Sequence, residues 1–127
     1  MPQESMRDED LLSLKYILER RLVYLQEMSY TLEQSLQEMS TLKLQENADI
    51  ISTQSQLRFD DSMLTRNQSE IGEIESSLLK FEQGSYGICE MCEEEIGIER
   101  LQAKPHARFC INCREIFEKK EKEKERT

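Results

Sequence analysis

All four cysteines of the 127-residue chain lie in one short stretch and form two CxxC pairs. Cys89 and Cys92 make the first pair, and Cys110 and Cys113 make the second. A CxxC turn offers two thiolates to the same metal ion, and the 17 residues between the pairs fall within the spacing of four-cysteine zinc sites. We therefore predict one zinc ion bound by these four side chains.

The predicted zinc should be structural rather than catalytic. Cysteine fills all four positions, so no position stays open for water or substrate. A redox dithiol is the alternative, but it needs only one CxxC pair and normally a βαβ context, which this sequence lacks. His106, the one histidine, is a rival ligand that we expect at the surface instead. With no second histidine and no phosphate-binding loop, the sequence does not suggest an enzyme.

Two long helices are predicted upstream of the cysteines, over residues 8–46 and about 52–81. Apolar side chains recur in each at alternating spacings of four and three residues, and Gly84 and Gly87 end the second pattern. Tyrosines and valine at positions 16, 23, 24 and 30 are expected to widen the first stripe. The seam positions are Leu11, Lys15, Leu18, Leu22, Leu25, Ser29, Leu32, Leu36, Met39 and Lys43, then Leu57, Asp60, Leu64, Asn67, Ile71, Ile74, Leu78 and Phe81.

The connection between these helices, residues 45–53, is too short to be a domain linker. Two helices joined in this way most simply fold back as an antiparallel hairpin. A parallel dimeric coiled coil or a helical bundle is the alternative, although the polar seam positions would weaken a continuous dimer.

The predicted fold class is therefore all-α: a long antiparallel coiled-coil hairpin, a small four-cysteine zinc-finger region and a short C-terminal helix. We divide the chain into residues 1–83, an N-terminal helical segment and hairpin with its tip near 46–52, and residues 84–127. The second part holds the zinc finger and a helix from about Ile111 that ends in a charged, solvated tail.

The chain is acidic, with a formal net charge of −9. Residues 1–88 carry 8 basic and 16 acidic side chains, whereas residues 89–127 carry 9 and 10. Binding to duplex DNA draws on Lys and Arg that displace counterions, so a basic protein surface or a cation is the better partner. No apolar run approaches the roughly 20 residues of a membrane span, and "MPQESMRDED" is no signal segment, so we expect a cytoplasmic protein.

The order of hairpin, "YGICEMCEEEIGIERLQAKPHARFCINC" and short charged helix resembles the DksA/TraR family of bacterial transcription regulators, and specifically its members with a full-length hairpin. The "YGxC" opening, "IGxxRL", Ala103, Pro105 and the closing "CxxC" carry the resemblance, which covers about residues 10–120. It implies a monomer that binds RNA polymerase without contacting DNA. The hairpin would enter the secondary channel with an acidic tip near the catalytic centre, and guanosine tetraphosphate would enhance the effect.

The resemblance also places contact residues on the hairpin. The family's tip pattern, Asp-x-x-Asp-x-Ala, falls on Glu46, Asp49 and Ile51. The second carboxylate matches, the first is conservatively changed, and isoleucine departs from the pattern, which puts tip activity in doubt. From the residues alone, the two carboxylates could simply solvate a turn. Arg66 matches a family arginine that faces polymerase on the second helix.

The resemblance further implies an alarmone site. Lys104 and Arg114 keep positive charge where the family places basic groups near the nucleotide. Glu73 stands where well-known members have lysine, and a carboxylate there would repel a tetraphosphate.

Two functions of other classes stay open from the residues. One is a structural or adaptor coiled coil whose zinc-clamped end docks a protein other than polymerase. The other is a zinc-ribbon DNA binder, which the nearly neutral C-terminal third disfavours.

Overall fold

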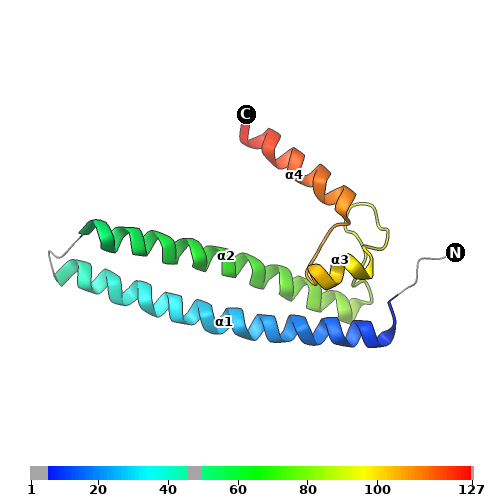
Figure 1. Cartoon of the computed structure of the whole chain (residues 1–127), viewed down its shortest axis with the longest axis horizontal. Helices are drawn as coiled ribbons and strands as arrows, with labels where there is room; N and C mark the ends of the chain where they lie inside the picture. The colour runs from blue at the N-terminus through cyan, green and yellow to red at the C-terminus, as the bar shows by residue number, and fades with distance from the viewer. Residues whose placement is uncertain (1–5, 46–49, 127) are drawn as a thin grey trace. The chain divides into compact units, whose positions relative to one another are not determined.

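The computed structural model describes residues 6–45 and 50–126, and the elements in these ranges are helices (Figure 1). An antiparallel bridge pairs Ile88 with Glu95. The predicted all-α class is confirmed, including a C-terminal helix that begins at residue 111. The helices are α1 (Asp8–Gln45), α2 (Ile50–Gln83), α3 (Ile98–Ala103) and α4 (Ile111–Arg126).

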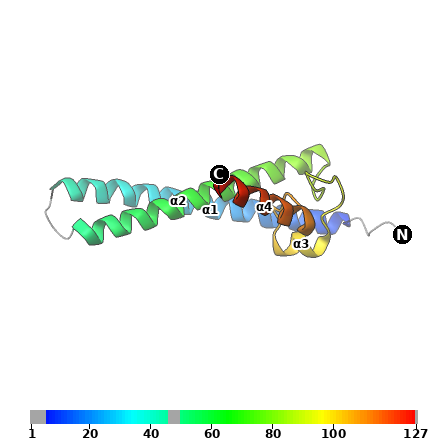
Figure 2. The same cartoon turned by 90° about the horizontal axis from the view of Figure 1, so that it is seen from above.

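Helices α1 and α2 pack side by side as the predicted antiparallel hairpin (Figure 2). The first turn of α1 contains three acidic residues, which interact favourably with the positive end of the helix dipole. Helix α2 stops at a glycine, because Gly84 adopts a φ of 74° that side-chain-bearing residues rarely adopt. The Ser85 amide then donates to the Lys80 carbonyl at 2.9 Å, which satisfies an orphan carbonyl at the helix end.

The chain forms two compact units. One comprises residues 20–72, and the other comprises residues 1–19 with 73–127. The cysteines therefore share a unit with the start of α1 and the end of α2. The domain boundary proposed from the sequence lies between residues 83 and 84, where α2 ends, and differs from the division into these two units. It stays a prediction.

In the unit of residues 20–72, the seam between the helices is partly polar. Leu25 is buried there, and so are Ser29, Asp60 and Asn67. The carboxylate of Asp60 accepts hydrogen bonds from Ser35 Oγ at 3.3 Å and Gln56 Nε2 at 2.9 Å. Ser29 Oγ and Asn67 Nδ2 have no hydrogen-bond partner among the described residues, so burying these two atoms lowers the stability of the seam.

In the other unit, aliphatic side chains dominate the helix contact. Leu14, Leu18 and Ile74 are buried, with Leu18 only 1% exposed. Leu101 of α3 is fully buried, and the ring of Phe81 stacks on that of Tyr86 with centroids 3.9 Å apart. Tyr86 Oη donates to the Pro105 carbonyl at 2.8 Å, so it ties the end of α2 to the loop after α3. Burial raises the pKa of this tyrosine.

One expectation about the first helix is wrong. Tyr16, Val23, Tyr24 and Tyr30 do not widen the buried stripe, because their side chains are between 50% and 64% exposed. Tyr16 and Val23 each precede a buried seam leucine by two residues, which is about 200° of rotation around the helix. They lie on the opposite side of α1 from the hairpin contact.

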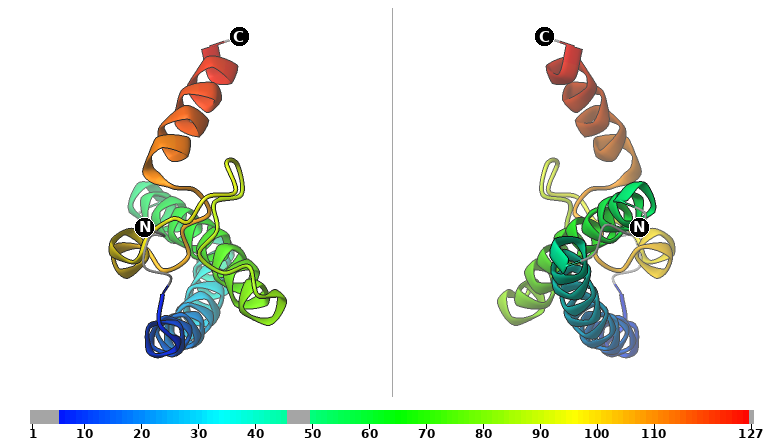
Figure 3. Two further views of the ribbon diagram at one scale, coloured as in Figure 1. Left: turned by 90° about the vertical axis from the view of Figure 1, so that its right-hand side faces the viewer. Right: turned by 90° about the vertical axis from the view of Figure 1, so that its left-hand side faces the viewer.

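Helix α4 projects away from α3 (Figure 3). Its first half packs through Phe117, whose ring lies 5.2 Å from that of Phe109, while residues 118–125 are exposed. None of the helices in the described ranges is both long and apolar enough to cross a membrane.

The packing of α1 predicts how two leucines of that helix differ. Leu18→Ala should lower the free energy of unfolding by roughly 2–5 kcal/mol, because it leaves a cavity in the seam. Leu12→Ala, the matched control at a side chain that is 69% exposed, should change it by less than about 0.5 kcal/mol. Urea denaturation of the zinc-loaded protein, followed by circular dichroism, measures both. Equal effects would contradict the assignment of the buried face.

Candidate functional site

The first cysteine pair sits on a tight backbone loop. Gly87, with a φ of 87°, turns the chain toward Cys89, and the Ile96 amide closes the loop by donating to the Gly87 carbonyl at 2.8 Å. Within it, the Cys89 amide donates to the Glu94 carbonyl at 2.8 Å, and Glu93 adopts a φ of 64°. These contacts hold Cys89 and Cys92 on the same knuckle.

The second cysteine pair is positioned by helix α4. Cys110 directly precedes the helix and Cys113 lies in its first turn, where the Arg114 amide donates to the Cys110 carbonyl at 2.9 Å. On the other side, Arg100 Nε of α3 donates to the Phe109 carbonyl at 2.9 Å. The second pair is therefore fixed from both α3 and α4.

The four sulfur atoms converge as a metal site requires. All four lie within 4.8 Å of one another, and Cys92 Sγ is 3.9 Å from Cys110 Sγ. A tetrahedron with zinc–sulfur bonds of about 2.3 Å has sulfur–sulfur edges of about 3.8 Å, so the donors fit zinc. All four thiols are free of disulfides. The residues present thus fit one structural zinc with no open position, as the sequence predicts.

The protonation of the cluster also favours a cation at its centre. Burial would raise the pKa of Cys89, but the backbone amides of Cys92, Cys110 and Met91 lower it to about 6. Burial, together with the neighbouring thiols, raises the pKa of Cys113 to about 12. Four thiolates this close repel one another strongly, whereas a divalent cation among them stabilises all four.

A cluster of charged side chains next to Cys89 was not anticipated from the sequence. Glu90 binds Lys80 Nζ at 2.7 Å and Arg108 Nε at 3.0 Å, and Arg108 adds a second bond at 3.1 Å. The bond to Arg108, reinforced by Lys80, lowers the pKa of Glu90 to about 2. The cluster joins the end of α2 to both knuckles. Its members are 10 and 18 residues apart with no shared motif, so no sequence signal could have found it.

His106 is not part of the sulfur cluster. Its Nε2 lies 3.4 Å from a carboxylate oxygen of Glu73, and its side chain is only 17% exposed. The residue is therefore partly shielded and paired, rather than lying freely at the surface.

A small cavity of about 110 Å³ brings together the residues that the family resemblance assigns to an alarmone. Lys104 and Arg114 line it, and so do Glu73, His106 and Arg108. Three basic side chains, Lys104, Arg108 and Arg114, line the cavity. Burial and then the charge of Arg114 lower the pKa of Lys104. Arg114 Nε contacts Glu118 at 2.8 Å. The cavity is cationic, but it contains one carboxylate.

The hairpin residues lie elsewhere in the chain. Glu46 and Asp49 lie outside the described residues. Ile51 lies in the first turn of α2. Arg66 lies on α2 in the unit of residues 20–72, where its side chain is exposed.

Comparison with known proteins gives consistent matches. The prokaryotic dksA/traR C4-type zinc finger matches residues 84–119. The RNA polymerase-binding transcription factor DksA of Buchnera aphidicola is 32% identical, over 95% of this chain and 80% of that protein. The Haemophilus influenzae protein of the same name is 28% identical, over 96% and 88%. The solved structure of transcription factor DksA2 from Pseudomonas aeruginosa matches with a TM-score of 0.77 and 26% identity, over 91% of this chain and 88% of that one.

The sulfur geometry predicts one zinc ion per chain. Cys113→Ser should abolish stoichiometric zinc binding, because it removes one of four thiolates, whereas His106→Ala should retain one equivalent. Residues 20–72 contain no cysteine, so helical circular dichroism should largely persist in Cys113→Ser. Elemental analysis of the purified proteins measures the metal. Zinc loss in His106→Ala, or full retention in Cys113→Ser, would show that the ligand set is wrong.

Proposed function

Since the chain belongs to the DksA/TraR family of C4-type zinc-finger proteins, we propose that it is a transcription regulator that binds RNA polymerase directly. The observation that carries the proposal is similarity over nearly the whole chain to proteins named for that activity. Both parts of the family architecture are present, namely a long hairpin and a closed four-cysteine cluster. The named relatives are transcription factors and not enzymes, and this chain is one of their family.

The hairpin is the element that we propose enters the polymerase secondary channel. Helices α1 and α2, which have 38 and 34 residues, form the long hairpin that the family architecture includes. Glu46 and Asp49 fall in this connection, and their carboxylates would meet the basic groups and the metal of the catalytic centre. Ile51 replaces the family's alanine with a larger, β-branched side chain, which alters the tip without removing either charge.

Arg66 is proposed as a polymerase contact along the hairpin. Its guanidinium is exposed, and no described side chain forms an ion pair with it at 4 Å or less. An arginine in this state can bind a carboxylate of a partner through two hydrogen bonds.

The cationic cavity is proposed as the place where guanosine tetraphosphate would bind. Lys104 and Arg114 supply positive charge suited to phosphate. Glu73 opposes that binding, because its carboxylate lines the same cavity and would repel an anion. We therefore propose a weak response to the alarmone in this protein.

The remaining features of the proposal follow from the partner. A protein that regulates RNA polymerase in this way works in the cytoplasm as a monomer and makes no direct DNA contact. The near balance of charge over residues 89–127 supports the last point.

The tip assignment predicts a separation of binding from inhibition. Asp49→Asn should bind polymerase with an affinity within about twofold of wild type, yet inhibit a sensitive promoter roughly tenfold less, because it loses the charge aimed at the catalytic centre. Asp61→Asn, an exposed carboxylate on α2, is the matched control and should behave like wild type. Run-off transcription measures inhibition. Wild-type inhibition by Asp49→Asn would refute the tip assignment.

The cavity predicts that one charge limits the alarmone response. Glu73→Lys should raise the affinity of the protein–polymerase complex for guanosine tetraphosphate by about tenfold, because repulsion becomes attraction. Glu75→Lys makes the same charge change at an exposed position outside the cavity, and should have little effect. Equilibrium binding of labelled nucleotide distinguishes them. Equal affinities in the two variants would remove Glu73 from the site.

A further inference from the structure

A second surface of the cysteine-containing unit has the features of a docking site. A groove of about 400 Å³ runs between residues 95–100 and the start of α4. Ile98 and Ile111 supply aliphatic wall, and the Ile111 side chain is 57% exposed. Glu95 and Glu99 line the same groove and are exposed. The groove therefore has an apolar wall that is bordered by two carboxylates.

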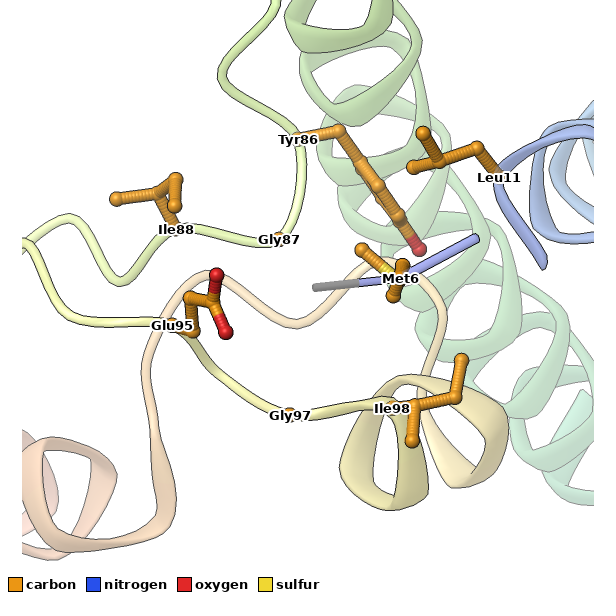
Figure 4. A pocket seen from close by; sticks show the side chains of 8 residues that line it. All are labelled: Met6, Leu11, Tyr86, Gly87, Ile88, Glu95, Gly97 and Ile98. Atoms are coloured by element: carbon orange, nitrogen blue, oxygen red, sulfur yellow. The ribbon is translucent and has the colours of Figure 1, made fainter. Parts of the chain in front are cut away.

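A smaller cavity of about 150 Å³ adjoins the groove and shares three residues with it, Glu95, Gly97 and Ile98. Figure 4 shows the side chains of Glu95 and Met6 among those that line this cavity. Leu11, Tyr86 and Ile88 are also part of its lining. One carboxylate in a largely apolar setting suits the end of a basic side chain, whose aliphatic stem can pack on the wall.

The acidic groups of the groove are not used by the fold. No basic side chain of the described ranges forms an ion pair with Glu95 or Glu99 within 4 Å. Arg100 is the one basic residue of the lining, and its Nε is occupied by the Phe109 carbonyl. Both carboxylates are therefore exposed to solvent, and neither forms an ion pair with a basic side chain of the described residues.

The groove is also held in shape before any partner arrives. The Ile88–Glu95 bridge and the bond from the Ile96 amide to the Gly87 carbonyl fix one side. The Leu101 amide donates to the Gly97 carbonyl at 3.1 Å and fixes the start of α3. A rigid groove loses little conformational entropy on binding, which favours a specific contact.

We propose that this groove binds a basic segment of RNA polymerase that carries an apolar anchor side chain. The anchor would pack between Ile98 and Ile111, and lysine or arginine side chains would pair with Glu95 and Glu99. The proposal rests on the proposed function for its partner, and it adds an attachment surface distinct from the hairpin tip, from Arg66 and from the cationic cavity.

Charge complementarity favours a basic partner over the other occupants. Residues 1–5 of this chain carry no basic side chain, so they cannot pair with the two glutamates. A second copy would have to insert its mixed-charge α4, which carries five exposed glutamates beside its four lysines. Self-association is therefore an outcome that the experiment must separate from polymerase binding.

The test compares groove variants with charge-matched and size-matched controls in the zinc-loaded, full-length protein. The double variant Glu95→Lys/Glu99→Lys should weaken binding to purified bacterial core RNA polymerase by about tenfold. Glu115→Lys/Glu121→Lys makes the same change in net charge on exposed α4 positions outside the groove and should change affinity by less than about threefold. Ile111→Ser should weaken binding, whereas Ile116→Ser, at a side chain 47% exposed on α4, should not.

Zinc content and circular dichroism identify any variant that has lost its fold, and size-exclusion chromatography reports the oligomeric state. If wild type binds polymerase but the groove variants bind equally well, or lose affinity no more than their controls, the groove proposal is wrong while the proposed function stands. A groove-dependent dimer with unchanged polymerase affinity would assign the groove to a second copy and overturn the proposal. If wild type fails to bind polymerase, the proposed function and this inference fail together.

Discussion

The convergence of four cysteine sulfurs is the constraint on which the unit that contains the cationic cavity and the apolar groove depends. Two sequence segments separated by 17 residues place their thiols within 4.8 Å of one another. Apolar side chains around α3 and the loops are buried, among them Ile96, Leu101 and Phe109, but they form only a small core, so a metal ion held by the four thiols would add a cross-link that stabilises this region. The cationic cavity and the apolar groove are built from segments that this cluster ties together, so both inherit their geometry from it.

In the hairpin, the polar residues of the seam between α1 and α2 disfavour pairing with a second chain as a coiled coil. Ser29, Asp60 and Asn67 are buried where a stable dimeric coiled coil would have aliphatic residues. The bidentate ion pair of Arg21 with Glu70, at 2.7 and 3.1 Å, links the two helices from outside. The polar seam is therefore less stable than an aliphatic one would be. We infer that the hairpin serves mainly to present the carboxylates proposed at its tip.

Periodicity and cysteine spacing predicted the helices, the glycine stop at Gly84 and the metal ligands, because each depends on local pattern or simple ligand chemistry. The prediction that Tyr16 and Val23 are buried was wrong. The sequence shows that these side chains are largely apolar, but it does not show whether helix α2 covers their side of α1. The Glu90 cluster and the groove at Ile111 could not be predicted. Both depend on how loops without regular structure fold over one another, which no spacing in the sequence encodes.

The proposed function depends on where the end of the hairpin lies when the protein is bound to RNA polymerase. The most direct measurement is to place a photo-crosslinking amino acid at position 49 of the zinc-loaded protein, irradiate its complex with polymerase and map the crosslinked peptides by mass spectrometry. We expect crosslinks to residues that line the secondary channel near the catalytic centre. Crosslinks confined to the outer surface of polymerase, in a complex shown to have formed, would contradict the proposed function.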